Sequence, residues 1–251
     1  MVNIIISGAS GRMGKQIKAA AENYDKINCV CGVDLNEDFS DKAFPVYKSF
    51  NDVKEKADVI IDFSSPKALD DLLSFAVKNG TNAVLCATGY TESNLSAVKK
   101  ASESIAVFRS ANMSLGVNVL IELVKKAAKA LSDFDVEIVE KHHSNKVDAP
   151  SGTAIMLADG IKEVQNDKKE IYGRHGIVGK RDKNEIGIHA IRGGTVVGEH
   201  DVYFLGNDEK ITISHEALSR KVFAEGALKA ALFIKDKKYG VFSMKDVINH
   251  A

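Results

Sequence analysis

The sequence is poor in the features that mark disulfide-rich, nucleic-acid-binding and membrane-spanning proteins. Its 3 cysteines, at positions 29, 31 and 86, are an odd number without a Cys-x-x-Cys pair, so they predict reduced thiols in a cytoplasmic protein. The 34 basic residues balance the 34 acidic ones and no Lys/Arg block stands out, which argues against a dedicated nucleic-acid or membrane surface. The apolar run at residues 2–6 is too short for a signal peptide or a membrane span.

Apolar residues, by contrast, are plentiful, and they occur in a regular order. They fill 45% of the 251 positions, enough for the cores of two modest domains. In the first half, short apolar runs alternate with helical patterns, which is typical of an α/β fold with a Rossmann-like, doubly wound parallel sheet. We expect strands at residues 2–6, 28–33, 58–62, 83–87 and 105–108, and helices at residues 67–79 and 92–102.

A glycine-rich turn follows the first expected strand and precedes a helical pattern. Gly8, Gly11 and Gly14 would let the backbone approach a pyrophosphate, which the N-terminus of the next helix favours electrostatically. The second expected strand ends in Asp34, 20 residues beyond Gly14, where a dinucleotide-binding unit keeps the acid that binds the ribose. Glycine turns alone are common, so the pairing with Asp34 is what favours a dinucleotide site over a purely structural turn.

The expected parallel strands end in small or polar residues, and ligands of such sheets collect at the carboxyl ends of the strands. Each of these ends, taken singly, could equally be an ordinary turn. Together they predict that the cofactor is bound by Gly8, Ala9, Ser10, Gly11, Arg12, Met13, Asp34, Cys86, Ala87, Thr88, Ser110, Ala111, Asn112 and Met113.

The choice between NADH and NADPH depends on opposing charges near the glycine turn. Asp34 would repel the 2′-phosphate of NADPH, and the next residues include Glu37 and Asp38 but no arginine. Arg12 and Lys15 could neutralise that phosphate from the other side. We therefore expect NADH to be preferred or comparable, with NADPH still accepted.

A second domain begins with a helical pattern at residues 117–131. After it we expect strands at residues 136–141, 186–191, 200–205 and 210–214, a helix at residues 153–164, and a polar, mobile stretch at residues 166–184. This mixture favours an α+β domain. A helix at residues 223–234 and a short apolar segment at residues 239–247 close the chain.

Many ionisable residues of this second domain lie in one short loop, residues 140–154. Pro150 must break the backbone there, and Ser151 is a good N-cap for the helix that follows. The N–H groups around Gly152 and Thr153 would favour a bound carboxylate, and Lys146 adds a full positive charge. The loop therefore predicts a site that binds anions and handles protons.

Two adjacent histidines stand at the end of the strand before this loop. Because successive strand side chains face opposite ways, only one of His142 and His143 should face a given ligand. The alternative is that both histidines simply face solvent without a functional role. A metal site is less supported, because adjacent imidazoles diverge and no third ligand follows at a suitable spacing. His189, His200 and His215 lie on expected strands, where a partly buried, hydrogen-bonded imidazole is the simpler interpretation.

The pattern of this loop, Glu-x-His-His-x-x-Lys-x-Asp-Ala-Pro-Ser-Gly-Thr-Ala, resembles the signature loop of the dihydrodipicolinate reductase family. The resemblance extends to residues 8–14, 88–89 and 111–116 in the first half, and to residues 191–194, 197–200, 219–220 and 223–224 in the second. Two departures stand out, since Cys86-Ala87 replaces a more usual Gly-Thr and Met113 replaces a frequent Phe.

The resemblance implies NAD(P)H-dependent reduction of 4-hydroxy-tetrahydrodipicolinate, with loss of water, to tetrahydrodipicolinate in lysine and diaminopimelate biosynthesis. His142 would be the general acid, and Lys146 a charge stabiliser or second proton donor. The dicarboxylate substrate would be bound by His143, Lys146, Ser151, Gly152 and Thr153.

The resemblance also implies how the chain is divided and assembled. Residues 1–113 and about 223–251 would form the dinucleotide-binding domain, and residues 114–222 the substrate-binding and oligomerisation domain of a homotetramer.

Two other functions are the alternatives to this reductase. One is another two-domain reductase of a small amino or keto acid, and the other is a non-catalytic dinucleotide sensor.

Overall fold

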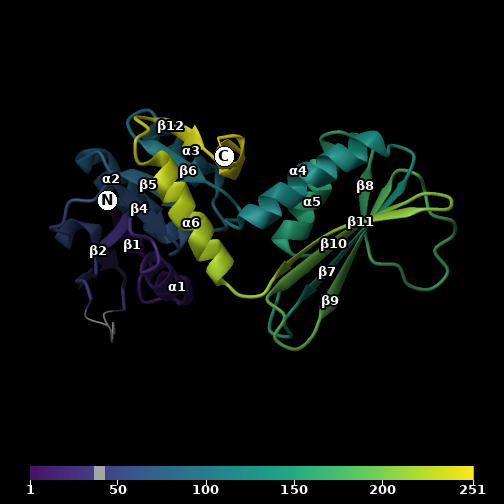
Figure 1. Ribbon diagram of the computed structural model, residues 1–251, viewed down its shortest axis with the longest axis horizontal. Coiled ribbons are helices and arrows are strands. Elements are labelled where there is room, and N and C mark those ends of the chain that lie inside the picture. The colour runs from purple at the N-terminus through teal and green to yellow at the C-terminus, as the bar shows by residue number, and fades with distance from the viewer. Residues whose placement is uncertain (37–42, 251) are drawn as a thin grey trace. The chain divides into compact units, whose positions relative to one another are not determined.

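The computed structural model describes residues 1–36 and 43–250, and the chain divides into two compact units. The first unit is formed by Met1–Leu115 and Arg220–Ala251, and the second by Gly116–Ser219. Figure 1 shows both units, the first with the two chain ends and the second with the helices α4 and α5. In the described residues, no helix is long and apolar enough to cross a membrane.

The first unit is built on a seven-stranded sheet in the order β12-β6-β5-β4-β1-β2-β3, and all of its strand pairs are parallel. The chain winds outward from β1 in both directions, so the strand order reverses beside β1, where doubly wound sheets bind ligands. The strands are β1 (Val2–Ser7), β2 (Ile27–Val33), β3 (Val46–Tyr47), β4 (Val59–Asp62), β5 (Asn82–Leu85), β6 (Ala106–Arg109) and β12 (Gly240–Phe242). The predicted Rossmann-like sheet is confirmed.

Helices cover both faces of this sheet, because β1 is apolar on both sides. Ile4 and Ile6 lie in one buried core with Ile17 of α1, whereas Ile5 lies in a second core with Leu72 of α2. The helices of the unit are α1 (Arg12–Ala21), α2 (Leu69–Asn79), α3 (Glu92–Ala101), α6 (Lys221–Ile234) and α7 (Met244–Asn249), with short 3₁₀ turns η1 (Phe50–Asp52) and η2 (Pro66–Ala68).

Gly226 lets α6 pack against the loop that follows β6. A Cβ at this position would lie 1.7 Å from the carbonyl oxygen of Met113, which is a backbone atom and cannot easily move. Helix α6 is therefore held against one of the predicted cofactor-binding segments by a contact that only glycine permits.

The second unit has a five-stranded sheet in the order β11-β10-β7-β9-β8. β7 and β8 run parallel to β9, and β10 runs antiparallel to β7 and β11. Side chains such as Val136, Ile138 and Phe204 pack with Val124 and Leu157 of the two helices in a single core. The elements are α4 (Leu115–Ala130), β7 (Asp135–His142), α5 (Gly152–Lys162), β8 (Lys169–Tyr172), β9 (Glu185–Arg192), β10 (Gly198–Leu205) and β11 (Lys210–Ala217).

The stretch at residues 166–184, which the sequence predicts to be polar and mobile, includes a strand. It contains β8, which pairs with β9 at the edge of the sheet. β8 was missed because only two of its four residues, Ile171 and Tyr172, have side chains typical of strands, while Lys169 and Glu170 are polar. Pairing with a neighbour from a later part of the chain supplies what the local pattern does not.

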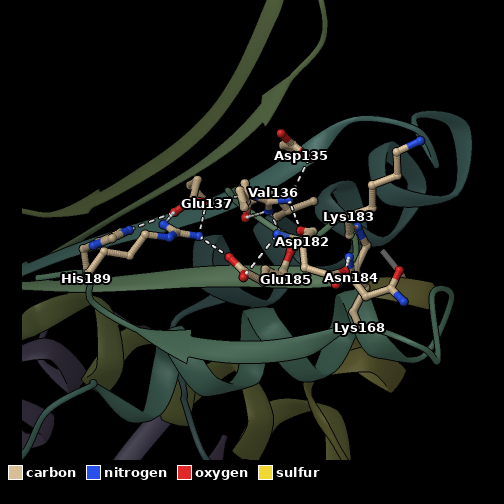
Figure 2. A network of polar contacts seen from close by, with 11 residues as sticks. Asp135, Val136, Glu137, Lys168, Asp182, Lys183, Asn184, Glu185 and His189 are labelled. Atoms are coloured by element: carbon tan, nitrogen blue, oxygen red, sulfur yellow. Dashed lines mark hydrogen bonds and ion pairs between the residues drawn. The ribbon is translucent and has the colours of Figure 1, made fainter. Parts of the chain in front are cut away.

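The rest of this stretch is tied to the sheet by a network of charges around Glu137 of β7 (Figure 2). Glu137 accepts hydrogen bonds from Arg174 at 2.9 and 3.0 Å, from Arg181 Nε at 3.1 Å, and from His189 Nε2 at 2.8 Å. A Cβ on Gly187 of the neighbouring strand would lie 1.8 Å from Glu137 Oε2, so glycine makes the room for this carboxylate.

Candidate active site

The turn between β1 and α1 brings the backbone close to any ligand that lies over it. Gly8 has a φ of +81°, which glycine adopts without strain, and its N–H donates to Val33 O at 2.8 Å. A Cβ on Gly14 would lie 2.3 Å from Gly8 O, so only glycine lets α1 start this close to the turn. Gly11 precedes α1 and has no side chain to cap it, so a phosphate can take the place of a side-chain cap.

Asp34 follows β2 and is tied to the same turn. Its Oδ2 accepts a hydrogen bond from Ser10 N and its Oδ1 accepts one from Asn36 N, both at 2.9 Å. The structure thus brings the acid and the glycine turn together, as their spacing predicts. Glu37 and Asp38, which the sequence adds to the negative charge near Asp34, lie outside the described residues.

Two cavities open at this end of the sheet, and both contain predicted cofactor-binding residues. A cavity of about 540 Å³ has Gly8, Gly11 and Asp34 in its wall. A second cavity of about 310 Å³ is lined by seven of the predicted residues, namely Arg12, Met13, Cys86, Thr88, Ala111, Asn112 and Met113. Phe63 lines both cavities, so the two are adjacent. Together with the glycine turn, they offer room in which a dinucleotide could be held.

Four predicted residues line neither cavity, and the structure shows what they do instead. Ala9 is buried beneath the turn, and Ser10 donates its hydroxyl to Asn36 O at 2.7 Å. Ser110 donates to Asn112 O at 2.7 Å, which shapes the loop that bears the other cavity residues. Ala87 lies next to Cys86 and Thr88 without reaching the cavity wall.

Several cavity residues were not predicted. Arg220 and Phe223 line the smaller cavity, and Lys48 and Lys67 line the larger one. The resemblance at residues 219–220 and 223–224 was the available sign of the first two. No local pattern marks the two lysines, because tertiary packing alone brings them beside Asp34.

Cys86, which stands where the family more usually has Gly, is a buried thiol. Burial raises its pKa well above the ordinary value, and the nearby Asp62 acts in the same direction. The thiol therefore stays protonated and neutral at physiological pH, so the departure places no charge in the cavity wall.

The centre of the charged loop in the second unit is Glu140, which is fully buried. Arg192 donates to both of its carboxylate oxygens, at 2.7 and 2.8 Å, and Ser151 N donates to Oε1 at 2.9 Å. His142 Nδ1 lies 2.6 Å from Oε2. Burial alone would raise the pKa of Glu140, but the bonds from Arg192, His142 and Ser151 outweigh it and lower the pKa, so Glu140 is ionised.

His142 ends β7, and its ring is largely enclosed, with 12% of the side chain exposed. The ring packs edge-on against His200, with centroids 5.3 Å apart. A Cβ on Gly198 would lie 3.0 Å from His142 Nε2, so the glycine keeps β10 clear of that nitrogen. Burial lowers the pKa of His142, Glu140 opposes this, and Lys146 and Arg192 lower it further.

Ser151 is the N-cap of α5, as the sequence predicts, because its Oγ accepts a hydrogen bond from Ala154 N at 3.2 Å. The same hydroxyl lies 2.8 Å from His200 Nε2. Burial lowers the pKa of His200 to about 4, so this imidazole is neutral at physiological pH. The interpretation of His200 as a buried, hydrogen-bonded histidine is confirmed, and His189 beside Glu137 fits the same description.

The remaining residues of the predicted substrate site are Lys146, His143, Gly152 and Thr153, which lie in the loop or at the start of α5. Lys146 binds both oxygens of Asp148, at 2.8 and 2.9 Å, so the positive charge that it adds to the loop is paired. His143 donates its backbone N–H to Val196 O at 2.8 Å. Gly152 and Thr153 form the first turn of α5, directly after Ser151.

The sequence missed two members of the cluster. Glu140 belongs to the loop pattern but receives no role from it, and Arg192 enters the sequence analysis only within residues 191–194 of the resemblance. Gly193 and Gly194 follow Arg192 and indicate a tight turn at the end of its strand. That turn was the available sign that the end of this strand lies close to a neighbouring strand. In the part of the chain that the structure describes, no group of three His, Cys, Asp or Glu side chains could hold a metal ion.

Comparisons with known proteins cover both units. A family model described as "Dihydrodipicolinate reductase, N-terminus" matches residues 2–113, and one described as "Dihydrodipicolinate reductase, C-terminus" matches residues 116–248. The chain is 53% identical over 249 residues to a 4-hydroxy-tetrahydrodipicolinate reductase of Caldanaerobacter subterraneus subsp. tengcongensis, covering 99% of this chain and 98% of the relative. It is 47% identical over 251 residues to the reductase of that name from Clostridium tetani, with the same coverage.

Solved structures show the same fold. A dihydrodipicolinate reductase from Paenisporosarcina sp. TG-14 with bound dipicolinate superposes with a TM-score of 0.78 at 24% identity, covering 97% of each chain. A probable dehydrogenase from Thermotoga maritima superposes with a TM-score of 0.62 at 12% identity, covering 98% of this chain and 92% of the other.

Proposed function

The chain belongs to the dihydrodipicolinate reductase family, and we propose that Glu140, His142 and Lys146 of its second unit carry the proton chemistry of that family's reaction. The protein is an NAD(P)H-dependent oxidoreductase that reduces 4-hydroxy-tetrahydrodipicolinate in lysine and diaminopimelate biosynthesis. What remains to be assigned is which side chains of this chain bind cofactor and substrate, and which one delivers a proton.

We assign the cofactor to the first unit. The glycine turn would hold the pyrophosphate at the start of α1, and Asp34 would hold the adenosine ribose in the larger cavity. The smaller cavity would then hold the nicotinamide among Met13, Thr88 and Asn112. When bound, the nicotinamide supplies the hydride, and its orientation is the task of the residues in that cavity.

We assign the substrate to the charged loop of the second unit. Dipicolinate bound to the reductase from Paenisporosarcina sp. TG-14 is a planar dicarboxylate, and a substrate of that class suits a site rich in donors. The backbone N–H groups at the start of α5, beside Gly152 and Thr153, can donate hydrogen bonds to one carboxylate. The ammonium of Lys146 can bind a substrate carboxylate by exchanging Asp148 for it, since Asp148 is an exposed partner.

His142 is the best candidate for the general acid. The reduction adds one hydride and one proton to the substrate, so a side chain that can release a proton near neutral pH must stand beside it. The observation that supports His142 is the arrangement of its two nitrogens, with Nδ1 held by an ionised carboxylate and Nε2 kept clear by Gly198.

The sheet of the second unit also suggests how copies assemble. We propose a homotetramer formed through the sheet face that is turned away from α4 and α5. Ile191 and Leu205 lie on that face, because they alternate along β9 and β10 with the core residues Ile188 and Phe204, and both are exposed in the single chain. Exposed apolar side chains of this kind are typical of surfaces that are covered in an assembly. Light scattering coupled to size-exclusion chromatography tests the proposal, and a monomer at micromolar concentration would contradict it.

The assignment of His142 is tested by the His142→Gln variant in an assay that follows NADH oxidation. The substrate is prepared fresh from pyruvate and aspartate semialdehyde with the preceding synthase. We expect kcat to fall by about 10²–10⁴ with little change in NADH affinity, because a general acid contributes that much to the chemical step. His189→Gln is the matched control, since His189 is also bound to a glutamate but belongs to the Glu137 network. A change in KM alone would make His142 a binding residue.

A further inference from the structure

The pair formed by the buried Glu140 and the partly exposed Arg192 has a geometry that determines which nitrogen of His142 carries a proton. The two oxygens of Glu140 receive four hydrogen bonds, two from Arg192, one from Ser151 N and one from His142 Nδ1. An ionised carboxylate can only accept hydrogen bonds, so the nitrogen that faces it must be the donor. His142 therefore carries a proton on Nδ1 in both of its charge states.

We propose that Glu140 is a positioning residue for catalysis, which fixes His142 in the Nδ1–H tautomer and leaves Nε2 as the atom that gives its proton to the substrate. The inference rests on the proposed role of His142 as the general acid. It adds the reason that one particular nitrogen acts and names the side chain responsible.

Arg192 makes this arrangement work near neutral pH. A lone buried carboxylate would stabilise the imidazolium and hold its proton, whereas the Arg192 charge neutralises Glu140 and faces the same ring. The ionisable groups around His142 are Glu140 on its own strand, Arg192 on β9, His200 on β10 and Lys146 in the loop. Only Glu140 stabilises the charged ring, so the ring can give the proton on Nε2 to the substrate in each turnover and take up another from water afterwards.

Strand register is what holds the three groups together. β7 pairs with β9 so that His142 lies opposite Arg192, and β10 pairs with β7 so that His200 lies opposite Glu140. The His200 ring packs edge-on against His142 and is itself bound to the Ser151 hydroxyl, so it limits rotation of the His142 ring. The nitrogen assignment therefore depends on side chains that are each fixed by a separate contact.

A purely structural role for Glu140 is the competing explanation, because the same carboxylate binds the start of α5. The two explanations differ in what the Glu140→Gln variant does to His142. Glutamine keeps the size of the side chain but offers an N–H₂ group that can face Nδ1, which would favour the Nε2–H tautomer. A structural role predicts lower stability with an unchanged tautomer and an unchanged pH profile.

The tautomer is measured directly by ¹⁵N NMR of the full-length protein labelled at histidine, with the His142 resonances identified from their absence in His142→Gln. We expect Nδ1 to be protonated in the neutral form of the wild type and Nε2 to be protonated in Glu140→Gln. A wild-type Nε2–H tautomer would overturn the proposal, and this measurement needs neither a variant of Glu140 that folds nor any activity.

Kinetics give a second readout. For Glu140→Gln we expect kcat at pH 7.5 to fall at least about hundredfold, with KM changed less than about threefold and the basic limb of the kcat profile moved to lower pH. Glu137→Gln is the matched control, because Glu137 is also held by arginines and lies on the same strand but does not contact His142. A folded Glu140→Gln enzyme with the wild-type pH profile would refute the positioning role. If His142→Gln were instead fully active, the proposed function would fail while the NMR result still decided the Glu140 contact.

Discussion

Glu137 offers a quantitative test of how the second unit is held together. The Glu137→Gln substitution keeps the shape of the side chain and removes its charge, which binds Arg174, Arg181 and His189 (Figure 2). Through the two arginines, this one carboxylate ties residues 174–181 to β7. Loss of the charge should therefore destabilise the edge of the sheet more than any exposed substitution nearby.

The size of the effect follows from the pKa of Glu137. Burial alone would raise it, but hydrogen bonds from Arg174, His189 and Arg181 outweigh burial and lower the pKa from the ordinary 4.5 to about 2. A shift of that size corresponds to about 3 kcal/mol of stability at neutral pH. Arg174 also binds Glu185 and Arg181 also binds Asp135, so the cations keep partners in the variant and we expect a loss of about 2 kcal/mol.

The stabilisation that Glu137 provides depends on pH. Because the folded-state pKa is lowered, the contribution is complete above pH 4.5 and is lost as the pH falls through the folded-state value of about 2. Urea unfolding of wild type and Glu137→Gln, followed by circular dichroism at pH 7, 5 and 3, should show a gap that is roughly halved at pH 3. Hydrogen exchange in β7 and β9 would localise the change.

Glu209→Gln is the control, because Glu209 is exposed on the turn after β10 in the same unit. It should change the free energy of unfolding by less than about 0.5 kcal/mol at every pH. A Glu137→Gln gap that stayed constant between pH 7 and pH 3 would show that packing and not charge is responsible. No gap at pH 7 would refute the network as a source of stability.

Three further predictions concern the substrate loop, the first unit and the cofactor. Lys146→Ala should lower kcat/KM by roughly ten- to hundredfold and leave NADH affinity unchanged, because a charged hydrogen bond to a carboxylate contributes about 1.5–3 kcal/mol; near-wild-type kcat/KM would contradict its place in the site. Gly226→Ala should lower the free energy of unfolding by more than about 2 kcal/mol, since the new methyl group would collide with the Met113 carbonyl; an unchanged urea midpoint would show that α6 can shift. NADH should be preferred to NADPH or comparable because of Asp34, and Lys67→Ala should weaken NADPH alone; an NADPH preference above about tenfold in kcat/KM, or 1.4 kcal/mol, would show that the basic side chains prevail.

Much of the first unit could be predicted, because the local composition of the sequence reveals where most of its strands lie. A strand buried on both faces is a short, nearly continuous apolar run, and β1 and β4 are of this kind. The short edge strands were not predicted. β3 has two residues and β8 has four, and both owe their existence to pairing with a longer neighbour.

The same distinction holds for the site, where local features could be predicted from the sequence and long-range contacts could not. The sequence by itself determined the glycine turn, the capping of α5 by Ser151 and the spacing of Asp34, because backbone angles and helix caps depend on residues within a few positions of each other. It could not determine that Arg192 would lie opposite His142 or that His200 would pack against His142, because these contacts join residues 50 and 58 positions apart. Strand register decides such contacts, and register is set by the packing of whole sheet faces in the tertiary structure.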